Sequence, residues 1–173
     1  MHILNSFNNS TSDIRLEASA TRTESSIKLA YKIDDPKNLM ALPKAFIANE
    51  NNISREDGLW NDTCFEMFLR PNGSSSYYEF NFSLKPASNE YFFDSYRQPQ
   101  PPRRSNDFLL NKYQWDGQNL VIEISGTNIP DNFAMSLTAV LKEKTGATHY
   151  LAVKHAGQEA DFHHTDSFVI KFS

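Results

Sequence analysis

The stretch TCFEMFLRPNGSSSYYEFNFSL (residues 63–84) has the pattern of two strands joined by a polar turn. Apolar residues alternate with other residues in both halves, which is the period of a β-strand. The segment PNGSSS between them carries the Pro, Asn, Gly and Ser residues that favour turns. The apolar face comprises Phe65, Met67, Leu69, Tyr78, Phe80, Phe82 and Leu84. The stretch therefore predicts an antiparallel hairpin with one face in the core.

The other face of this hairpin carries polar residues. Glu66 lies on the first strand, and Glu79 and Asn81 lie on the second. We expect Phe65 to face Phe80 across the ladder, and this register sets Glu66 directly opposite Glu79. Because two carboxylates repel each other across a ladder, we expect a cation or a ligand between them.

Arg97 is the nearest candidate for that cation. It ends the segment EYFFDSYR (90–97), which we expect to form the next strand. If Phe92 and Tyr96 lie on the core face, Arg97 shares the face of the two glutamates. The other register would bury an unpaired guanidinium at a high cost in free energy. The pattern thus predicts a polar group of this arginine with the glutamates and the asparagine; a solvated face with a weak ion pair is the alternative.

Period-two alternation continues along the rest of the chain. It runs over residues 14–19 and 27–33, and the later strand-like segments are separated by short runs rich in Gly, Pro, Asn, Asp and Ser. Short strands at this spacing predict an all-β antiparallel sandwich of about ten strands, of the immunoglobulin-like or jelly-roll kind. We expect helix only as short turns, chiefly within residues 34–58, and a single domain over residues 1–173.

The composition limits which kinds of molecule the protein is expected to bind. The 173 residues carry a net charge of −4, whereas a nucleic-acid-binding protein needs a basic face to neutralise phosphates. No apolar run reaches the roughly 20 residues that span a bilayer, and the N-terminus lacks a signal-peptide pattern. The one cysteine, Cys64, excludes an internal disulfide. These features predict a cytoplasmic protein without a nucleic-acid or membrane partner.

Four of the five histidines come late in the chain: His149, His155, His163 and His164. The segment EADFHHTDSF (159–168) also places Asp161 and Asp166 beside the histidine pair. Zinc binds His, Cys and carboxylate ligands, so the composition permits a metal site. Adjacent residues of a strand point to opposite faces, however, and no HExxH or CxxC pattern is present. We therefore assign no metal ligand and no cofactor.

We expect the segment DFHH (161–164) to be a loop at one end of the sandwich, before a last strand that begins near Asp166 or Ser167. Phe162 should anchor this loop in the core and leave its acidic and imidazole groups to point outward or into a pocket. Ligand contact and loop-capping hydrogen bonds both fit such a loop. Alternation in the last strand predicts three buried residues, Phe168, Ile170 and Phe172.

No catalytic residue is assigned. A GxSxG elbow is absent, the six glycines form no phosphate loop, and Cys64 lies in a strand without a neighbouring base. Glu66 and Glu79 are a carboxylate pair of the kind that glycosidases use, but neighbouring strands would hold them too close together for that chemistry. The sequence leaves an enzyme unsupported.

Trp60 and Trp115 lie next to predicted turns. An exposed indole near Arg, Asp and Asn suits a sugar site, because the ring packs on C–H faces while polar groups meet hydroxyls. A tryptophan that fills the core is the alternative reading for each.

The stretch from residue 58 to residue 97 resembles the DOMON-like relatives of family-nine carbohydrate-binding modules. The W-x-D-x-x-E-x-F-like strand of that superfamily reads here as Trp60, Asp62, Glu66 and Phe68, with one extra residue between the aspartate and the glutamate. The ending AVKHAGQEADFHHTDSF (152–168) is similar to that of small bacterial DOMON-like proteins. The match begins near Arg55.

This resemblance implies a β-sandwich with a pocket for sugar or haem on one face. Haem-binding members use a Met and a His as axial ligands, and the candidates here are Met40, Met67 and Met135. Sugar-binding members clamp the end of a glycan between two tryptophans, for which Trp60 lies in the matching strand.

The sequence therefore predicts a non-catalytic module for a saccharide or another small polar ligand. A metal-dependent enzyme site on the C-terminal His loop and a haem-binding domain stay open as alternatives. We further expect His155 and one of His163 or His164 to line the same pocket as Trp60 and Arg97. The full set of candidate ligand-binding residues is Arg55, Trp60, Asp62, Glu66, Glu79, Asn81, Arg97, His155, Asp161, His163 and His164.

Overall fold

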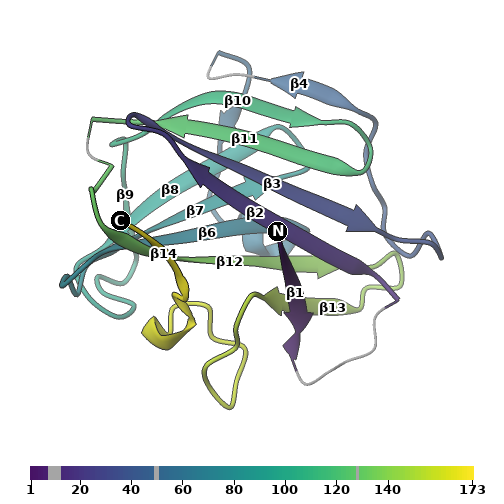
Figure 1. Cartoon of the computed structure of the whole chain (residues 1–173). Coiled ribbons are helices and arrows are strands. Elements are labelled where there is room, and N and C mark those ends of the chain that lie inside the picture. The colour runs from purple at the N-terminus through teal and green to yellow at the C-terminus, as the bar shows by residue number, and fades with distance from the viewer. Residues whose placement is uncertain (8–12, 49–50, 128) are drawn as a thin grey trace.

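The computed structural model describes residues 1–7, 13–48, 51–127 and 129–173, and within them nearly all regular structure is β-strand (Figure 1). The strands are β1 (His2–Ser6), β2 (Arg15–Arg22), β3 (Ser26–Asp34), β4 (Phe46–Ala48), β5 (Ser54–Arg55), β6 (Cys64–Pro71), β7 (Tyr77–Ser83), β8 (Ala87–Phe93), β9 (Arg103–Arg104), β10 (Leu109–Trp115), β11 (Asn119–Ser125), β12 (Phe133–Lys142), β13 (Thr148–Ala152) and β14 (Ile170–Phe172). The described 3-10 helices are η2 (Leu59–Asn61) and η3 (Thr165–Ser167).

The strands follow one hydrogen-bonded order that curls into two layers. One layer runs β4–β10–β11–β3–β2–β1 and the other runs β13–β12–β6–β7–β8–β5, with β14 added to β12 and β9 added to β8. Strand β1 joins the layers, since Leu4 pairs with Leu16 of β2 while Asn5 pairs with Ala152 of β13. Among the named strands all pairings except the short β5–β8 pair are antiparallel. The predicted all-β antiparallel sandwich is confirmed.

The described residues form fourteen strands, whereas the sequence predicted about ten. The strands that the sequence missed include β5 and β9, with two residues each, and β4, with three. Such segments are too short to show alternation. Both described 3-10 turns lie outside the predicted range of 34–58. Because η3 occupies residues 165–167, the last strand begins at Ile170, later than predicted.

The main core lies between the two layers. The inward side chains of β6 and β7 pack there, and burial of each large apolar side chain contributes about 1.5–3 kcal/mol. They are Phe65, Met67, Leu69, Phe80 and Phe82. Trp115 is also buried in this core, and its Nε1 donates a hydrogen bond to the carbonyl of Pro43 at 3.1 Å. Trp115 is therefore a core residue, which is one of the two interpretations that the sequence left open.

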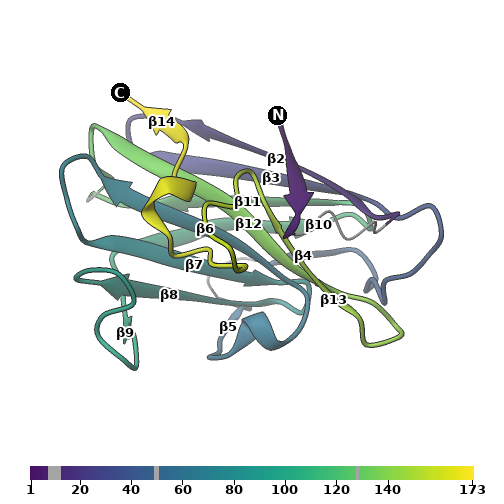
Figure 2. The ribbon, with the colours of Figure 1, turned by 90° about the horizontal axis from the view of Figure 1, so that it is seen from below.

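The outer face of β6, β7 and β8 is covered by a second apolar cluster. In Figure 2 the C-terminal segment crosses β6 and β7 on this side. The aromatic members of the cluster are Phe68, Tyr77, Tyr91, Phe93, Phe162 and Phe168. Phe162 anchors the segment as predicted, and Phe168 is buried while Val169 is exposed. Ile170 and Phe172 are only half-buried, because they lie on the short edge strand β14.

The hairpin of β6 and β7 has the predicted faces but a different register. The observed pairs include Phe65–Phe82, Glu66–Asn81, Met67–Phe80 and Phe68–Glu79. The expected pairing of Glu66 with Glu79 is therefore wrong by two residues. A slip of two keeps every side chain on its face, so alternation does not distinguish the two registers. The observed register avoids setting two carboxylates directly opposite each other.

Arg97 does not lie in a strand, contrary to the prediction, because β8 ends at Phe93. It lies in the turn that follows, with a φ of 51°. This left-handed conformation is uncommon for residues other than glycine. The turn carries the guanidinium back to the outer face of the sheet, where the prediction had placed it.

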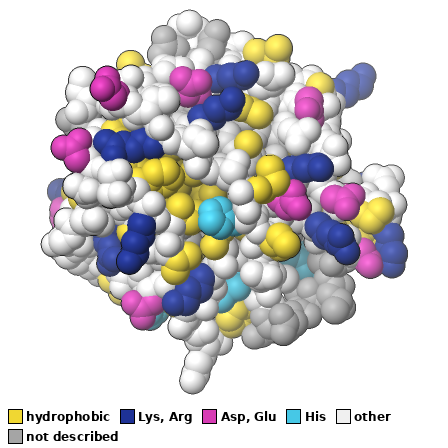
Figure 3. Space-filling model, in the orientation of Figure 1, with side chains coloured by type: hydrophobic (Ala, Val, Ile, Leu, Met, Phe, Trp, Pro, Cys, Tyr) yellow, Lys and Arg dark blue, Asp and Glu magenta, His cyan; other side chains and the backbone are white. Residues whose placement is uncertain are grey.

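No helix in the described part of the chain is long and apolar enough to cross a membrane. Over the face that Figure 3 shows, basic and acidic side chains of the described residues are interspersed.

Candidate functional site

A pocket of about 330 Å³ opens on the outer face of β6, β7 and β8. This volume is near the lower end of the range of about 300–1,000 Å³ for ligand pockets. Five of the predicted site residues line it: Trp60, Glu66, Glu79, Arg97 and His163. The remaining lining residues are Asn61, Phe68, Phe93, Gln100, Pro102, Val140, Tyr150, Ala160 and Phe162. The pocket thus collects residues from η2, five strands, the turn after β8 and the C-terminal segment.

Two buried carboxyl groups form part of the pocket lining. Glu66 is 3% exposed and Glu79 is 6% exposed. Thr138 Oγ1 donates to Glu66 Oε2 at 3.2 Å, and Asn81 Nδ2 donates to Glu79 Oε1 at 2.8 Å. Burial, with the charge of Glu79 adding to it, raises the pKa of Glu66 well above its usual range. Burial raises the pKa of Glu79 to about 7, so the pair is partly protonated at neutral pH.

His163 lies beside these carboxyls as a neutral imidazole. The Tyr77 hydroxyl accepts the backbone N–H of Arg97 at 3.1 Å and lies 2.8 Å from His163 Nδ1. We assign the phenol as the donor to Nδ1, because the other ring nitrogen, Nε2, faces the Glu79 carboxyl, which accepts hydrogen bonds. The ring proton of His163 is then on Nε2, 3.7 Å from Glu79 Oε2. Burial, with the charge of Arg97 adding to it, lowers the pKa of His163 to about 4. The imidazole therefore presents an N–H donor to the pocket at neutral pH.

Asp161 fixes the position of Arg97 at the pocket wall. Arg97 Nη2 donates to Asp161 Oδ1 at 2.8 Å, and Tyr96 Oη donates to Asp161 Oδ2 at 2.7 Å. The backbone N–H of His163 donates to Asp161 Oδ1 at 3.1 Å. Burial would raise the pKa of Asp161, but the hydrogen bonds from Tyr96 and Arg97 outweigh it and lower that pKa. Asp161 thus orients the arginine and the histidine turn together.

Trp60 stands at the mouth of the pocket and is 41% exposed. It lies in η2, which follows Gly58 at a φ of 73°, a conformation that favours glycine. The ring of Tyr91 packs edge-on against the indole at 6.0 Å between centroids. Tyr150 of β13 is a second exposed aromatic residue in the lining.

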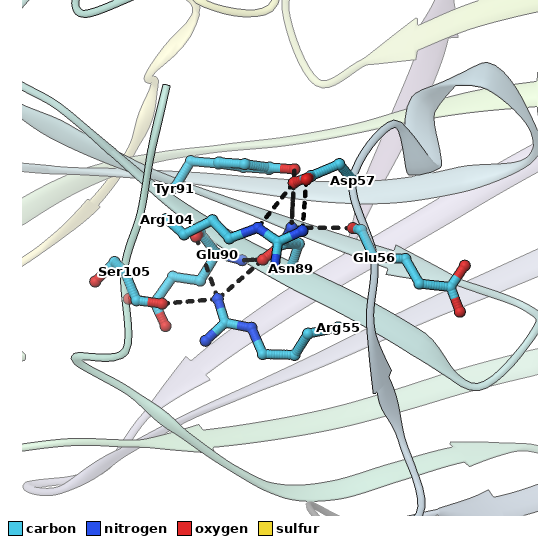
Figure 4. Close-up of polar contacts among 8 residues, drawn as sticks. All are labelled: Arg55, Glu56, Asp57, Asn89, Glu90, Tyr91, Arg104 and Ser105. Carbon is cyan, nitrogen blue, oxygen red and sulfur yellow. Dashed lines mark hydrogen bonds and ion pairs between the residues drawn. The ribbon is translucent and has the colours of Figure 1, made fainter. Parts of the chain in front are cut away.

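A polar network holds the loop that carries Trp60 (Figure 4). Asp57 is its centre, because Tyr91 Oη donates to Asp57 Oδ1 at 2.7 Å and Asn89 Nδ2 donates to the same oxygen at 2.9 Å. Arg104 Nε also donates to Asp57 Oδ1, at 3.0 Å. Since the ring of Tyr91 touches the indole while its hydroxyl holds Asp57, side chains of β8 and β9 position Trp60.

Arg55 belongs to the same network (Figure 4), but it lines a different cavity. Its Nη2 donates to Asn89 Oδ1 at 2.9 Å and to the carbonyl of Ser105 at 2.7 Å. With Phe80, Phe82 and other residues it lines a cavity of about 230 Å³ that opens between the two layers. The structure therefore separates Arg55 from the pocket that the other candidate residues form.

Asp62 and Asn81 are close to the pocket but do not line it. Asp62 points to solvent and forms an ion pair with Lys85 at 2.9 Å. Asn81 is fully buried and donates to Glu79. Asn81 therefore orients the carboxyl of Glu79, whereas Asp62 does not contact the pocket.

His155 and His164 lie outside the pocket lining. His155 Nε2 is 2.8 Å from the carbonyl of Asn5. His164 precedes η3, and its Nδ1 accepts the backbone N–H of Asp166 at 3.3 Å. The prediction that His155 shares the pocket with Trp60 and Arg97 is wrong, and His164 makes the loop-capping hydrogen bond of the alternative reading.

Several residues in or beside the pocket were not among the sequence candidates, and Tyr77, Tyr150 and Gln100 are the informative cases. Tyr77 shares the parity of Glu79 in β7, so alternation alone placed it on the polar face. Tyr150 lies in a short strand, and Gln100 lies in the run QPQPP between β8 and β9. No periodic signal marks either of these two.

The described residues do not fit the alternative chemistries. They contain no group of three His, Cys, Asp or Glu side chains that is placed to hold a metal ion. Met40, Met67 and Met135 are buried in the core between the layers, whereas His163 faces the pocket, so ligation of haem by a Met and a His does not fit. Burial raises the pKa of the Cys64 thiol well above its usual value, which makes it a poor nucleophile.

Comparison with known proteins gives a likeness of fold. No protein-family model and no curated protein matches the sequence. The structure is similar to the crystal structure of a "putative carbohydrate-binding protein" from Bacteroides uniformis ATCC 8492, with a TM-score of 0.67. The match covers 99% of this chain and 83% of that chain at 11% sequence identity. It supports the sandwich fold, and at this identity it transfers no residue roles.

Proposed function

We propose that this protein is a non-catalytic binding module whose ligand is a small polar molecule, with a saccharide as the preferred class. The observation that carries the proposal is the composition of the pocket: an exposed indole at its mouth and two buried carboxyls in its lining. A sugar ring has apolar C–H faces and a hydroxyl edge. An aromatic wall with convergent polar groups complements both parts.

In this proposal each lining residue has a defined part. Trp60 packs against a C–H face of the ring, and Glu66 and Glu79 accept hydrogen bonds from hydroxyls. His163 donates through Nε2 and Arg97 donates through its guanidinium. Asn81 and Asp161 act indirectly, because they hold Glu79 and Arg97 in place.

Two further observations support a saccharide. The structural neighbour from Bacteroides uniformis is described as carbohydrate-binding, which is a statement about that protein. The sequence also resembles DOMON-like relatives of family-nine carbohydrate-binding modules. Of the residues that carry this resemblance, Trp60, Glu66 and Phe68 line the pocket, while Asp62 pairs with Lys85.

A thermal-shift screen followed by titration calorimetry tests the proposal. The panel contains neutral, amino and acidic monosaccharides and their disaccharides, together with haemin and zinc as probes of the alternative classes. A ligand that binds only the native state at 100 times its Kd stabilises it by about 2.7 kcal/mol. We expect a shift with at least one sugar. Stabilisation by haemin or zinc, and by no sugar, would contradict the proposal.

The variant Trp60→Ala locates the binding site. We expect it to weaken sugar binding at least about tenfold, because aromatic packing supplies much of the contact area in such pockets. Ile47→Ala is the matched control: Ile47 is also an exposed large hydrophobic residue, but it lies on β4 in the other layer. Equal affinities of the two variants for a confirmed sugar would place the ligand elsewhere.

A further inference from the structure

We propose that the pocket selects a cationic saccharide, one whose ring carries a free amino group, over neutral and acidic sugars. This inference rests on the proposed function and deepens it. It follows from the charges that line the pocket, from the hydrogen bonds that the two glutamates receive, and from the place of the arginine.

The pocket lining has an excess of acidic groups. Glu66 and Glu79 both line it, and Arg97 is the basic residue among the lining residues. The guanidinium of Arg97 is already paired with Asp161, at 2.8 Å. His163 is neutral at pH 7, since burial lowers its pKa to about 4. Asp161 offsets much of the charge of Arg97, so the arginine compensates the two carboxyls only in part.

The carboxyls also receive few hydrogen bonds for their burial. Among the described residues, the structure gives the Glu66 carboxyl one donor, Thr138 Oγ1, and gives Glu79 the amide of Asn81. His163 Nε2 is too far from Glu79, at 3.7 Å, for a normal hydrogen bond. Each carboxylate has about four acceptor positions, so most of this capacity is available to a ligand. An ammonium group supplies three donors and a positive charge at once.

The other titratable groups near Glu66 and Glu79 do not change the excess of acidic groups in the pocket. The Cys64 thiol and the Tyr31 phenol are buried, and the Tyr77 phenol is bonded to His163; burial raises the pKa of all three, which keeps them neutral. Lys142 of β12 is exposed, and its Nζ donates to the carbonyl of Asn61 at 3.3 Å. A carboxylate on a sugar would therefore meet like charges in the lining, whereas an ammonium would meet opposite ones.

Binding of an ammonium is coupled to the protons of the pair. Because both pKa values are raised, the pair holds a proton near neutral pH that a bound cation displaces. Affinity for the amino sugar should then rise as pH increases from 5 to 7. Neutral sugars should show no such increase.

The test compares each of glucosamine, galactosamine and mannosamine with its parent sugar and its N-acetyl derivative, by calorimetry at pH 7. We expect at least one amino sugar to bind about tenfold or more tightly than both of its partners, as charge-assisted hydrogen bonds allow. Measurement in two buffers of different ionisation enthalpy should show that protons are released on binding.

The isosteric variants E66Q and E79Q assign the selectivity to the pair. Each should reduce the preference for the amine, taken as the ratio of the affinities for the amine and for its parent sugar in the same variant, to about threefold or less. The control is E90Q, because Glu90 has the same 6% exposure as Glu79 but lines the cavity between the layers. It should retain the full preference.

The outcomes separate this inference from the proposed function. If a parent sugar binds as tightly as its amine, or if binding releases no protons, the inference is overturned and the proposed function stands. If no sugar of any charge binds, both are overturned. A preference that persists in E66Q and in E79Q also overturns the inference.

Discussion

Tyr77 of β7 and His163 of the C-terminal segment are joined by a hydrogen bond of 2.8 Å across 86 residues of sequence. The same phenol accepts the backbone N–H of Arg97 at 3.1 Å. One hydroxyl therefore ties together the sheet, the turn after β8 and the C-terminal segment. These are the three parts of the chain that supply Glu79, Arg97 and His163 to the pocket.

Tyr77→Phe should destabilise the protein by about 2 kcal/mol, because it leaves a buried imidazole nitrogen and a backbone N–H without their partner. Urea unfolding measures this change. Tyr78→Phe is the matched control: it removes the neighbouring hydroxyl, whose hydrogen bond to Asp107 is exposed to solvent. The control should cost less than about 1 kcal/mol. Equal losses of unfolding free energy in the two variants would show that the hydrogen bond to His163 contributes no more to stability than a solvent-exposed one.

Arg97→Ala should destabilise the protein by about 1–2 kcal/mol, because it leaves the partly buried Asp161 without its cation. It should also raise the pKa of Glu79 further, since the charge of Arg97 lowers that pKa. Arg103→Ala is the matched control, because Arg103 also pairs with an aspartate. Each arginine also lies over an aromatic ring, Tyr96 for Arg97 and Phe92 for Arg103. Both partners of the Arg103 ion pair are more than half exposed, so the control should cost under about 1 kcal/mol. The midpoint of urea unfolding should therefore be lower for Arg97→Ala than for Arg103→Ala, and the opposite order would contradict this prediction.

The sequence predicts the acidic part of the site, because which residues share a face of the sheet depends only on whether their positions along each strand are odd or even. Glu66, Glu79 and Asn81 share the outer face in any register that differs by an even number of residues. Which residues face each other depends on the length and geometry of the turn, which alternation does not encode. The true register sets Asn81 opposite Glu66, so the two carboxyls are diagonal neighbours rather than a direct pair, although the charge of Glu79 still raises the pKa of Glu66.

The rest of the site depends on contacts between segments that are distant in the chain. Arg97 reaches the pocket from a turn with a left-handed φ, and Asp161 meets it from 64 residues away. His163 and His164 are neighbours in a loop, where no periodicity tells which one faces inward. Tertiary packing decides it: Phe162 fills the outer cluster and directs His163 to the pocket.

Gly58→Ala should displace Trp60 and shift the fluorescence of the protein. A Cβ at this position would lie 2.9 Å from Asn61 Nδ2, and its φ of 73° is already unfavourable for alanine. Gly73→Ala separates the two effects, because Gly73 has a φ of 77° and no heavy atom within 4 Å of such a Cβ. Each variant should lose about 1 kcal/mol from the backbone term. We expect the emission change in Gly58→Ala alone, since Trp60 lies in the turn that follows Gly58 whereas Trp115 is buried in the core. A change of equal size in Gly73→Ala would contradict this account.

The pH dependence of stability should reveal the buried Glu79. Its pKa is raised from 4.5 to about 7 on folding, so the native state binds more protons than the unfolded state between these values. The stabilisation that this group contributes is therefore complete below pH 4.5 and is lost as pH rises through 7. His163 acts in the opposite sense, because its pKa is lowered from 6.5 to about 4 and stability is gained as pH rises over that range. The two effects oppose each other up to about pH 6.5, above which the loss from Glu79 remains.

Glu79→Gln removes the carboxyl and leaves the effect of His163. Relative to the unmodified protein, the free energy of unfolding of this variant should increase by about 2 kcal/mol between pH 4.5 and pH 8, given about 1.4 kcal/mol for each unit of pKa shift and a share of the shift that belongs to the coupled Glu66. Urea unfolding at intervals of one pH unit measures the difference. Glu24→Gln, at an exposed turn position, is the control and should follow the unmodified protein at every pH. If the Glu79→Gln profile also runs parallel to that of the unmodified protein, Glu79 does not carry a raised pKa in the folded state.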